Sequence, residues 1–221
     1  MSRAVIARPC PRCPACRLPP RWCICAAHRA LTSPLAVDLL MHYCEVHRPS
    51  STGHLVHRLL PDSRLLIGGG GRPLDRATLD RPGRELWVLH PQGQLPPANV
   101  PPVSVQVLLI DGSWKQASDL LRTIKGWGRT VRLPMSGTSR FHLRTQQGDG
   151  QFSTIEALLF LLGHFGLESV QKEMGLQFEL HVFAGLLARG KQLDARRYLA
   201  GSPLREAFPE LVARLDPPPP V

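Results

Sequence analysis

An aspartate stands at the point where a buried strand gives way to a helix, a position suited to chemistry. The run 105–110 is almost continuously apolar and β-branched, which predicts a strand buried on both faces and places Asp111 at its carboxyl end. From Trp114 onward the apolar residues recur at helical spacing, and Ser113 is the predicted N-cap. Because ligands of open α/β sheets collect outside the carboxyl ends of the strands, Asp111 is a candidate catalytic residue. The alternative is that it only caps the turn.

A cluster of cysteines near the N-terminus has the density of a metal site. Five of the six cysteines fall between Cys10 and Cys25, and in a reducing compartment such a cluster favours a metal over disulfides. The predicted ligands of a zinc ion are Cys13, Cys16, Cys23 and Cys25. Cys10 is an alternative ligand. Four thiolates leave no open position for a substrate, so the zinc would be structural. Free thiols in a disordered arm are the other interpretation.

A second polar loop stands between a predicted strand, 35–41, and a predicted helix that carries Leu55 on its apolar face. Free backbone N–H groups and the helix dipole make such a loop, here residues 51–53, a natural anion site. Arg48 adds a side chain that can bind a carboxylate or a phosphate. An ordinary capped helix is the alternative. The sixth cysteine, Cys44, lies in the same stretch and is predicted to be a small buried hydrophobe.

The elements that must position these residues alternate between strand and helix. Further strands are predicted at 63–67, 85–90 and 130–133, and further helices at 154–165 and, amphipathic in its pattern, at 172–188. This alternation predicts an α/β fold with a mostly parallel sheet and helices on both of its faces.

A capping box opens the helix that begins at Thr154. Ser153 is the predicted N-cap and Glu156 stands at the third helical position, from which it can simply reach back to the Ser153 N–H group. The loop 134–150 before it is long for a compact domain, which indicates a functional role. The glycine run 68–71 is a predicted turn and not a phosphate loop, because no Gly-Lys-Ser/Thr sequence follows it.

The charge balance points to a polyanionic partner. The formal net charge is +10, from 27 Lys and Arg against 17 Asp and Glu, and nucleic acid is the commonest partner of such a protein. No apolar run reaches the roughly 20 residues that span a bilayer, and residues 1–9 lack the apolar core of a secretory signal. We therefore expect a soluble, cytoplasmic protein with no membrane partner.

The excess of positive charge is greatest after the central helix. Basic residues there are interleaved with Trp127, Phe141 and His142, which favours a surface for phosphates and unstacked bases. The candidate RNA-binding residues are Lys115, Arg122, Lys125, Arg129, Arg140 and Arg144. A solvated basic face is the alternative.

Together, and in this order, these motifs resemble the DTW-domain family, the tRNA-uridine aminocarboxypropyltransferases. The family's pattern is matched by the cysteines Cys13, Cys16, Cys23 and Cys25, by His42, Glu45, Arg48, Ser51, Thr52 and Gly53, by Asp111 and Trp114, and by Arg144, Gln146, Ser153, Thr154, Glu156 and Ala157. The resemblance covers about residues 13–162. Ser51 replaces the usual Asn, and Ser113 stands where Thr is common.

The resemblance implies a reaction and a fold. The 3-amino-3-carboxypropyl group of S-adenosylmethionine, the co-substrate, would pass to N3 of a uridine in tRNA and leave methylthioadenosine. The fold would be similar to the knotted, SPOUT-like α/β methyltransferases, with the cofactor in loops at the strand ends. The implied cofactor-binding residues are Glu45, Arg48, Thr52, Gly53, Trp114, Leu133, Pro134, Ser153, Thr154 and Glu156.

Within that reaction we assign hypothetical roles to the charged residues. Uridine N3 must lose a proton before it can attack, and we expect Asp111 to accept or orient that proton. Arg48 or Arg144 would hold the carboxylate of the donor's amino acid arm, and Glu45 or Glu156 its ammonium group.

The chain is expected to comprise a Cys-rich zinc-binding segment (1–30), a DTW catalytic domain (31–215) and a proline-rich tail (216–221). Two other functions stay open at this point. A knotted RNA methyltransferase would use the same cofactor but transfer the methyl group, and a non-catalytic zinc-containing RNA-binding module would need only the cysteines and the basic surface. The sequence leaves open whether the protein is a monomer or a homodimer.

Overall fold

A computed structural model describes residues 11–144 and 150–216. Its centre is a five-stranded sheet in the order β2-β1-β4-β3-β5, and every neighbouring pair of strands is parallel. The strands are β1 (Ala36–His42), β2 (Leu65–Gly68), β3 (Glu85–Gln94), β4 (Val105–Asp111) and β5 (Arg129–Val131). The predicted parallel α/β sheet is therefore confirmed. Cys10, Gln146 and the proline-rich tail lie outside the described residues.

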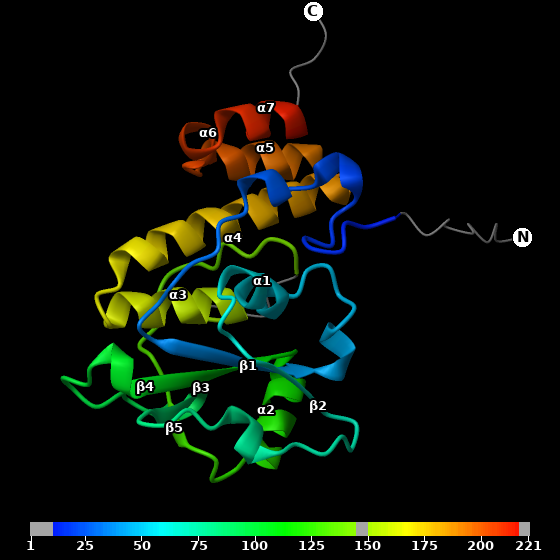
Figure 1. Cartoon of the computed structure of the whole chain (residues 1–221). Coiled ribbons are helices and arrows are strands. Elements are labelled where there is room, and N and C mark those ends of the chain that lie inside the picture. Colours follow the sequence, from blue (N-terminus) through cyan, green and yellow to red (C-terminus); the bar gives the residue numbers. More distant parts are fainter. Residues whose placement is uncertain (1–10, 145–149, 217–221) are drawn as a thin grey trace, which may run out of the picture.

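Helices cover both faces of the sheet, and each face has its own apolar core (Figure 1). Successive residues of a strand point to opposite faces, so Leu39 packs toward α1 and α3 while its neighbour Leu40 packs toward α2. The inner strands β1 and β4 are buried on both sides, which explains their apolar runs. The helices next to the sheet are α1 (Thr52–Leu59), α2 (Trp114–Thr123) and α3 (Thr154–His164).

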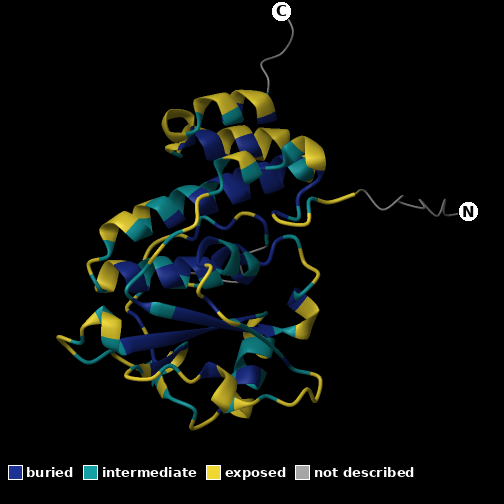
Figure 2. Cartoon of the chain, in the orientation of Figure 1, coloured by how far each residue is buried: buried dark blue, intermediate teal, exposed yellow. Residues whose placement is uncertain are grey.

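A second helical layer lies over α3, on the side away from the sheet (Figure 1). It consists of α4 (Glu168–Ala188), α5 (Gln192–Ala200), α6 (Leu204–Ala207) and α7 (Pro209–Leu215). The C-terminal half of α4 is buried nearly all round, because α3, α5 and the N-terminal segment pack against it (Figure 2). The helix predicted over 172–188 is confirmed as part of α4, but its predicted amphipathic character was wrong for this reason, and α5 to α7 were not predicted.

Short 3-10 helices occupy several of the connections, namely η1 (Pro20–Trp22), η2 (Cys25–Ala27), η3 (Tyr43–Glu45), η4 (Arg76–Leu79) and η5 (Pro102–Ser104). The turn of η3 buries Glu45 and leaves Cys44 exposed. The prediction that Cys44 is a buried hydrophobe was therefore wrong. Among the described helices, none combines the length and apolar character needed to cross a membrane.

The predicted local signals at the helix starts and turns are confirmed. Ser113 caps α2 in a capping box with Gln116, and Ser153 forms the predicted capping box with Glu156 at the start of α3. Residues 69–71 adopt positive φ angles of 85°, 63° and 72°, a conformation that only glycine adopts at little cost. These caps and turns fix where each helix begins relative to the carboxyl edge of the sheet.

Candidate active site and metal centre

A cavity of about 560 Å³ opens at the carboxyl edge of the sheet. It lies where β4 ends, beside residues 89–91 of β3, and where α1, α2 and α3 begin, which is where open α/β sheets hold their ligands. Its volume is in the range of small-molecule sites. The sequence-predicted residues that line it are Arg48, Thr52, Asp111, Trp114, Leu133, Arg144, Ser153 and Thr154.

Asp111 is the central polar group of this cavity. Its side chain is only 3% exposed, and each of its oxygens accepts a hydroxyl hydrogen bond. Ser51 Oγ donates to Oδ2 at 2.7 Å, and Thr154 Oγ1 donates to Oδ1 at 2.7 Å. The carboxylate thus lies between the N-termini of α1 and α3, whose dipoles favour a negative charge.

Gly53 permits this close approach. A Cβ atom at this position would lie 2.8 Å from Asp111 Cγ and 2.8 Å from Oδ2, too close for any real contact. Gly53 itself does not line the cavity, and its role is to let the first turn of α1 lie against the aspartate. The serine that replaces the usual Asn at position 51 supplies both the N-cap of α1 and a hydrogen bond to Asp111.

Glu45 is a fully buried carboxylate between two arginines. Arg48 Nη1 donates to its Oε1 at 2.9 Å, and Arg144 donates to its Oε2. Both arginines line the cavity and Glu45 does not, so the glutamate holds two cationic groups in place at the cavity wall. Its oxygens are engaged by these two guanidinium groups, and a direct contact with the donor's ammonium group would have to compete with them.

The carboxylate of Glu156 also accepts several hydrogen bonds, but its donors belong to the preceding loop and to the N-cap of α3. Ser153 donates to it from its backbone N at 2.8 Å and from Oγ at 2.7 Å, Ser139 Oγ donates at 2.9 Å, and the Arg140 backbone N donates at 2.7 Å. Glu156 is buried and does not line the cavity. It ties the preceding loop to the start of α3. Pro134 also lies outside the cavity wall.

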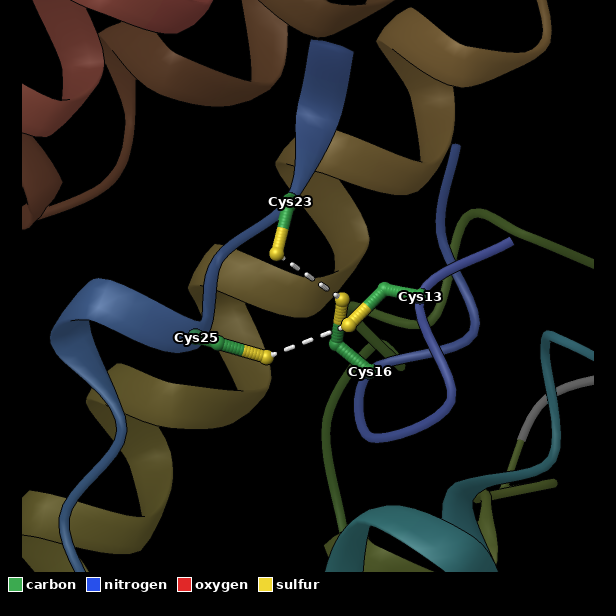
Figure 3. A group of neighbouring side chains, drawn as sticks. All are labelled: Cys13, Cys16, Cys23 and Cys25. Atoms are coloured by element: carbon green, nitrogen blue, oxygen red, sulfur yellow. Dashed lines mark hydrogen bonds between the residues drawn. The ribbon is translucent and has the colours of Figure 1, made fainter. Parts of the chain in front are cut away.

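The four predicted zinc ligands converge at the N-terminal segment (Figure 3). The sulfur atoms of Cys13 and Cys25 are 3.6 Å apart, those of Cys16 and Cys23 are 3.7 Å apart, and all four lie within 4.8 Å of one another. A tetrahedral ion with zinc–sulfur bonds of about 2.3 Å needs sulfurs about 3.8 Å apart. None of the four is in a disulfide. The cluster therefore fits a zinc ion.

The thiols of this cluster differ in acidity. Hydrogen bonds from the backbone N–H groups of Cys16 and Ala15 lower the pKa of Cys13 to about 6, whereas burial raises the pKa of Cys25 to about 12. A bound metal requires thiolates, so its binding would displace protons from the more basic thiols.

The surroundings of the cluster belong to the core of the protein. Arg58 of α1 donates to the sulfur of Cys25 at 3.8 Å, Gln177 of α4 donates to the carbonyl of Ala27 at 2.7 Å, and Arg214 of α7 donates to the carbonyl of Cys23 at 3.0 Å. The cysteine segment therefore joins three helices that are far apart in the sequence.

The sequence model of the DTW domain matches residues 10–187. The chain belongs to the DTW-domain family. The match extends from the first cysteines to the end of α4, so α5, α6 and α7 lie beyond it. No solved structure matches the chain.

The structure adds residues to the DTW-domain cavity that sequence reasoning missed. His90 and Pro91 lie in β3 just beyond its pairing with β4, and Arg132 is a third cavity-lining arginine. A sequence signal for His90 existed, because the carboxyl ends of parallel strands meet at one edge and His90 ends the predicted strand 85–90, as Asp111 follows the predicted strand 105–110. The structure extends that strand to Gln94. Met135 and Phe141 add apolar side chains to the wall of the cavity, and they come from the long loop that was predicted to be functional.

The candidate RNA-binding residues of the DTW domain fall into different environments. Lys115 is exposed at the start of α2, next to Trp114, which lines the cavity and is 38% exposed. Lys125 is exposed beyond the C-terminal end of the same helix. Arg122 and Arg129 are exposed but engaged with Asp119 and Glu85.

Of the candidate RNA-binding residues, Arg140 is the one whose guanidinium is most fully engaged by other side chains of the protein. Its guanidinium makes two 2.6 Å hydrogen bonds to Glu179 and lies 4.4 Å from the ring centre of Tyr198. These contacts join the loop before α3 to α4 and α5, and they raise the pKa of Arg140. Arg144, as described above, lines the cavity.

Proposed function

We propose that this protein transfers the 3-amino-3-carboxypropyl group of S-adenosylmethionine to N3 of a uridine in cytoplasmic tRNA, with methylthioadenosine as the second product. The observation that carries the proposal is the buried Asp111 in a ligand-sized cavity together with the arginines of the cavity wall. Membership of the DTW-domain family supports it, since this family is consistent with a tRNA-modifying function.

The cationic wall suits the amino acid arm of the donor. Arg48 and Arg144 are held by Glu45, and Arg132 lines the same cavity, so a carboxylate entering it meets guanidinium groups that are already oriented. Ser153 and Thr154 add the N-terminus of α3 on that side. These groups would fix the arm in an extended position. A fixed arm presents its γ-carbon rather than the methyl group to the attacking nitrogen.

The chemistry requires one proton transfer and one displacement. The N3–H proton of uridine passes to Asp111, the N3–Cγ bond forms, and the Cγ–S bond breaks with its electron pair going to the sulfonium sulfur. An ionised carboxylate has about four acceptor sites, so Asp111 can accept this proton or orient it while Ser51 and Thr154 stay bonded. Low exposure strengthens each of these electrostatic contacts.

The α2 side of the cavity suits the RNA. Trp114 is an aromatic platform on which an unstacked base can stack, and the exposed Lys115 follows it in the first turn of α2 for the phosphate backbone. Lys125, exposed beyond the other end of α2, would meet phosphates further along the RNA. The zinc site would be structural, because four cysteines complete the coordination sphere. We also propose, from the family resemblance, that the chain path around this parallel sheet is knotted.

The second product provides the test. Protein, S-adenosylmethionine and unmodified tRNA are incubated, and the adenosine products are separated by chromatography. We expect methylthioadenosine, formed only when tRNA is present. S-adenosylhomocysteine instead would make the protein a methyltransferase, and tRNA binding without either product would leave a binding module.

A further inference from the structure

His90 has a polar atom for which the described protein offers no partner. It is 5% exposed, it lines the cavity, and it lies in β3 directly after Leu89, the last residue of that strand that pairs with β4. Its Nε2 atom is buried and has no hydrogen-bond partner among the described residues. A buried polar atom without a partner is costly, so such an atom in a cavity wall points to a ligand.

The other ring nitrogen determines what Nε2 can do. The backbone N–H of Gln92 donates to His90 Nδ1 at 3.2 Å, so Nδ1 is an acceptor. A neutral imidazole has one donor and one acceptor nitrogen, which places the ring proton on Nε2. Burial lowers the pKa of His90, and the ring is therefore neutral at neutral pH. His90 presents a single N–H donor to the ligand.

The strand pattern places this donor on the side of the cavity that α2 forms. Leu86 and Val88 pack with α2, and His90 continues their alternation along β3. Leu89 pairs with Leu109, so His90 lies beside the last residues of β4. Asp111 faces the opposite side of the sheet, where α1 and α3 supply its hydroxyl partners.

We propose that His90 Nε2 donates a hydrogen bond to a carbonyl oxygen of the acceptor uracil, O2 or O4, and is a further catalytic residue. This role rests on the proposed function. Loss of the N3 proton leaves negative charge shared between the ring nitrogen and the two carbonyl oxygens. A donor already in place at one oxygen stabilises that charge as it develops, while His90 keeps its own proton throughout.

The distribution of charge in the cavity favours the base over the donor molecule as the partner of His90. The carboxylate-binding arginines Arg48 and Arg144 meet at Glu45, in the segment that leads into α1. Trp114, the stacking platform, begins the helix that His90 faces. A uracil stacked there would bring its carbonyl edge toward the His90 N–H and its N3 toward Asp111.

The test separates binding of the donor from the chemical step. The affinity for S-adenosylmethionine is measured by calorimetry without RNA, and the rate of aminocarboxypropyl transfer is measured in single turnovers with both substrates saturating. Wild type is compared with His90→Phe, which removes the N–H, and with His90→Gln, whose amide keeps one. His164→Phe, at the exposed far end of α3, is the matched control.

We expect His90→Phe to lose about 100-fold in the single-turnover rate with unchanged affinity for S-adenosylmethionine, and His90→Gln to recover part of that loss. A wild-type rate in His90→Phe would overturn the proposal. So would weaker S-adenosylmethionine binding with a normal rate at saturation, because the contact would then be to the donor. If His90→Phe does not fold, His90→Ala, which also removes the N–H, is judged by the same two measurements.

The two proposals fail in different ways. A wild-type protein that binds S-adenosylmethionine but transfers no aminocarboxypropyl group refutes the proposed function, and the role of His90 falls with it. A wild-type protein that transfers the group at a rate that His90→Phe matches refutes only the role of His90.

Discussion

At the scale of single residues, the cavity is built from polar groups that hold one another in place. Glu45 binds two arginines, and Glu156 holds the loop before α3 by hydrogen bonds. Asp111 accepts hydrogen bonds from two hydroxyl groups. Of these three buried carboxylates, only Asp111 also lines the cavity. It is therefore the carboxylate whose charge a substrate can meet directly.

Asp111→Asn tests this distinction. The amide keeps the shape of the carboxylate, and the hydroxyl groups of Ser51 and Thr154 can turn to accept a hydrogen bond from it, so we expect a folded protein that still binds S-adenosylmethionine. Without a base, the rate of transfer should fall by about 100-fold or more. Steady-state kinetics and calorimetry measure the two effects. Asp194→Asn on the exposed surface of α5 is the control. Full activity of Asp111→Asn would mean that Asp111 only joins the starts of α1 and α3 by hydrogen bonds and takes no part in the reaction.

At the scale of elements, the site depends on how closely the start of α1 approaches the end of β4. Gly53 permits that approach, and the caps Ser113 and Ser153 fix where α2 and α3 begin. The zinc segment acts further away, because its contacts are to α1, α4 and α7 rather than to the cavity.

Gly53→Ala and Gly175→Ala form a matched pair. The added methyl group at position 53 would lie 2.8 Å from Asp111, so the aspartate or α1 must move. We expect lower turnover and a loss of about 1–3 kcal/mol in the free energy of unfolding. At position 175, inside α4, an added Cβ atom would meet no heavy atom within 4 Å beyond its chain neighbours and the nearby backbone of its own helix, and alanine should stabilise the helix by up to about 1 kcal/mol without affecting turnover. Denaturant titration and kinetics check both. Equal effects of the two substitutions would contradict the claim that the site requires α1 to lie close against Asp111 at position 53.

Removal of the metal should affect stability before chemistry. The cysteine segment joins α1, α4 and α7, so chelation should lower the melting temperature by at least about 4 °C, with recovery on adding zinc. Below that transition, transfer to tRNA should continue. Thermal unfolding and activity of the chelated protein provide the measurement, with metal analysis as the control. Lost activity in a metal-free protein that stays folded would instead place the zinc in substrate binding.

At the scale of the whole molecule, one buried histidine links stability to pH. His181 of α4 lies in the core, where burial, with Arg58 and Arg189 nearby, lowers its pKa from the ordinary 6.5 to about 4. Between these two values the unfolded chain binds a proton that the folded protein does not. Stability is therefore unaffected by this group above the unfolded pKa and is lost as the pH falls below it.

The free energy of unfolding should accordingly fall between about pH 7.5 and about pH 5.5, with His181 contributing up to about 1.4 kcal/mol per pH unit once the unfolded chain protonates. His181→Leu removes this contribution, and its stability should depend less steeply on pH than that of the wild type. Denaturant midpoints at the two pH values, with zinc saturating in both proteins, make the comparison. Identical slopes would mean that His181 is protonated in the folded state.

Those parts of the molecule that depend on local sequence were predictable. Buried strands appear as apolar runs, caps as Ser before a helix, and the carboxyl-edge position of Asp111 as the end of such a run. The DTW-domain motifs include the cavity residues Arg48, Asp111 and Thr154. The ion pair between Glu45 and Arg144 could not be predicted, because the two residues are 99 positions apart and meet only in the folded protein.

The C-terminal helices were missed for a related reason. A helix that is buried on all sides, as α4 is in its second half, carries no polar stripe from which the layer of α5 to α7 above it could be predicted. The exposure of Cys44 was missed because a single 3-10 turn decides it.

The most direct test of the central claim follows two labels in one reaction. S-adenosylmethionine labelled in its carboxyl carbon and S-adenosylmethionine labelled in its methyl group are incubated separately with the wild-type protein and unmodified tRNA, and the RNA is recovered. We predict that the carboxyl label stays with the RNA and the methyl label does not. Methyl label in the RNA, or label from neither donor while the tRNA still binds, would contradict aminocarboxypropyl transfer.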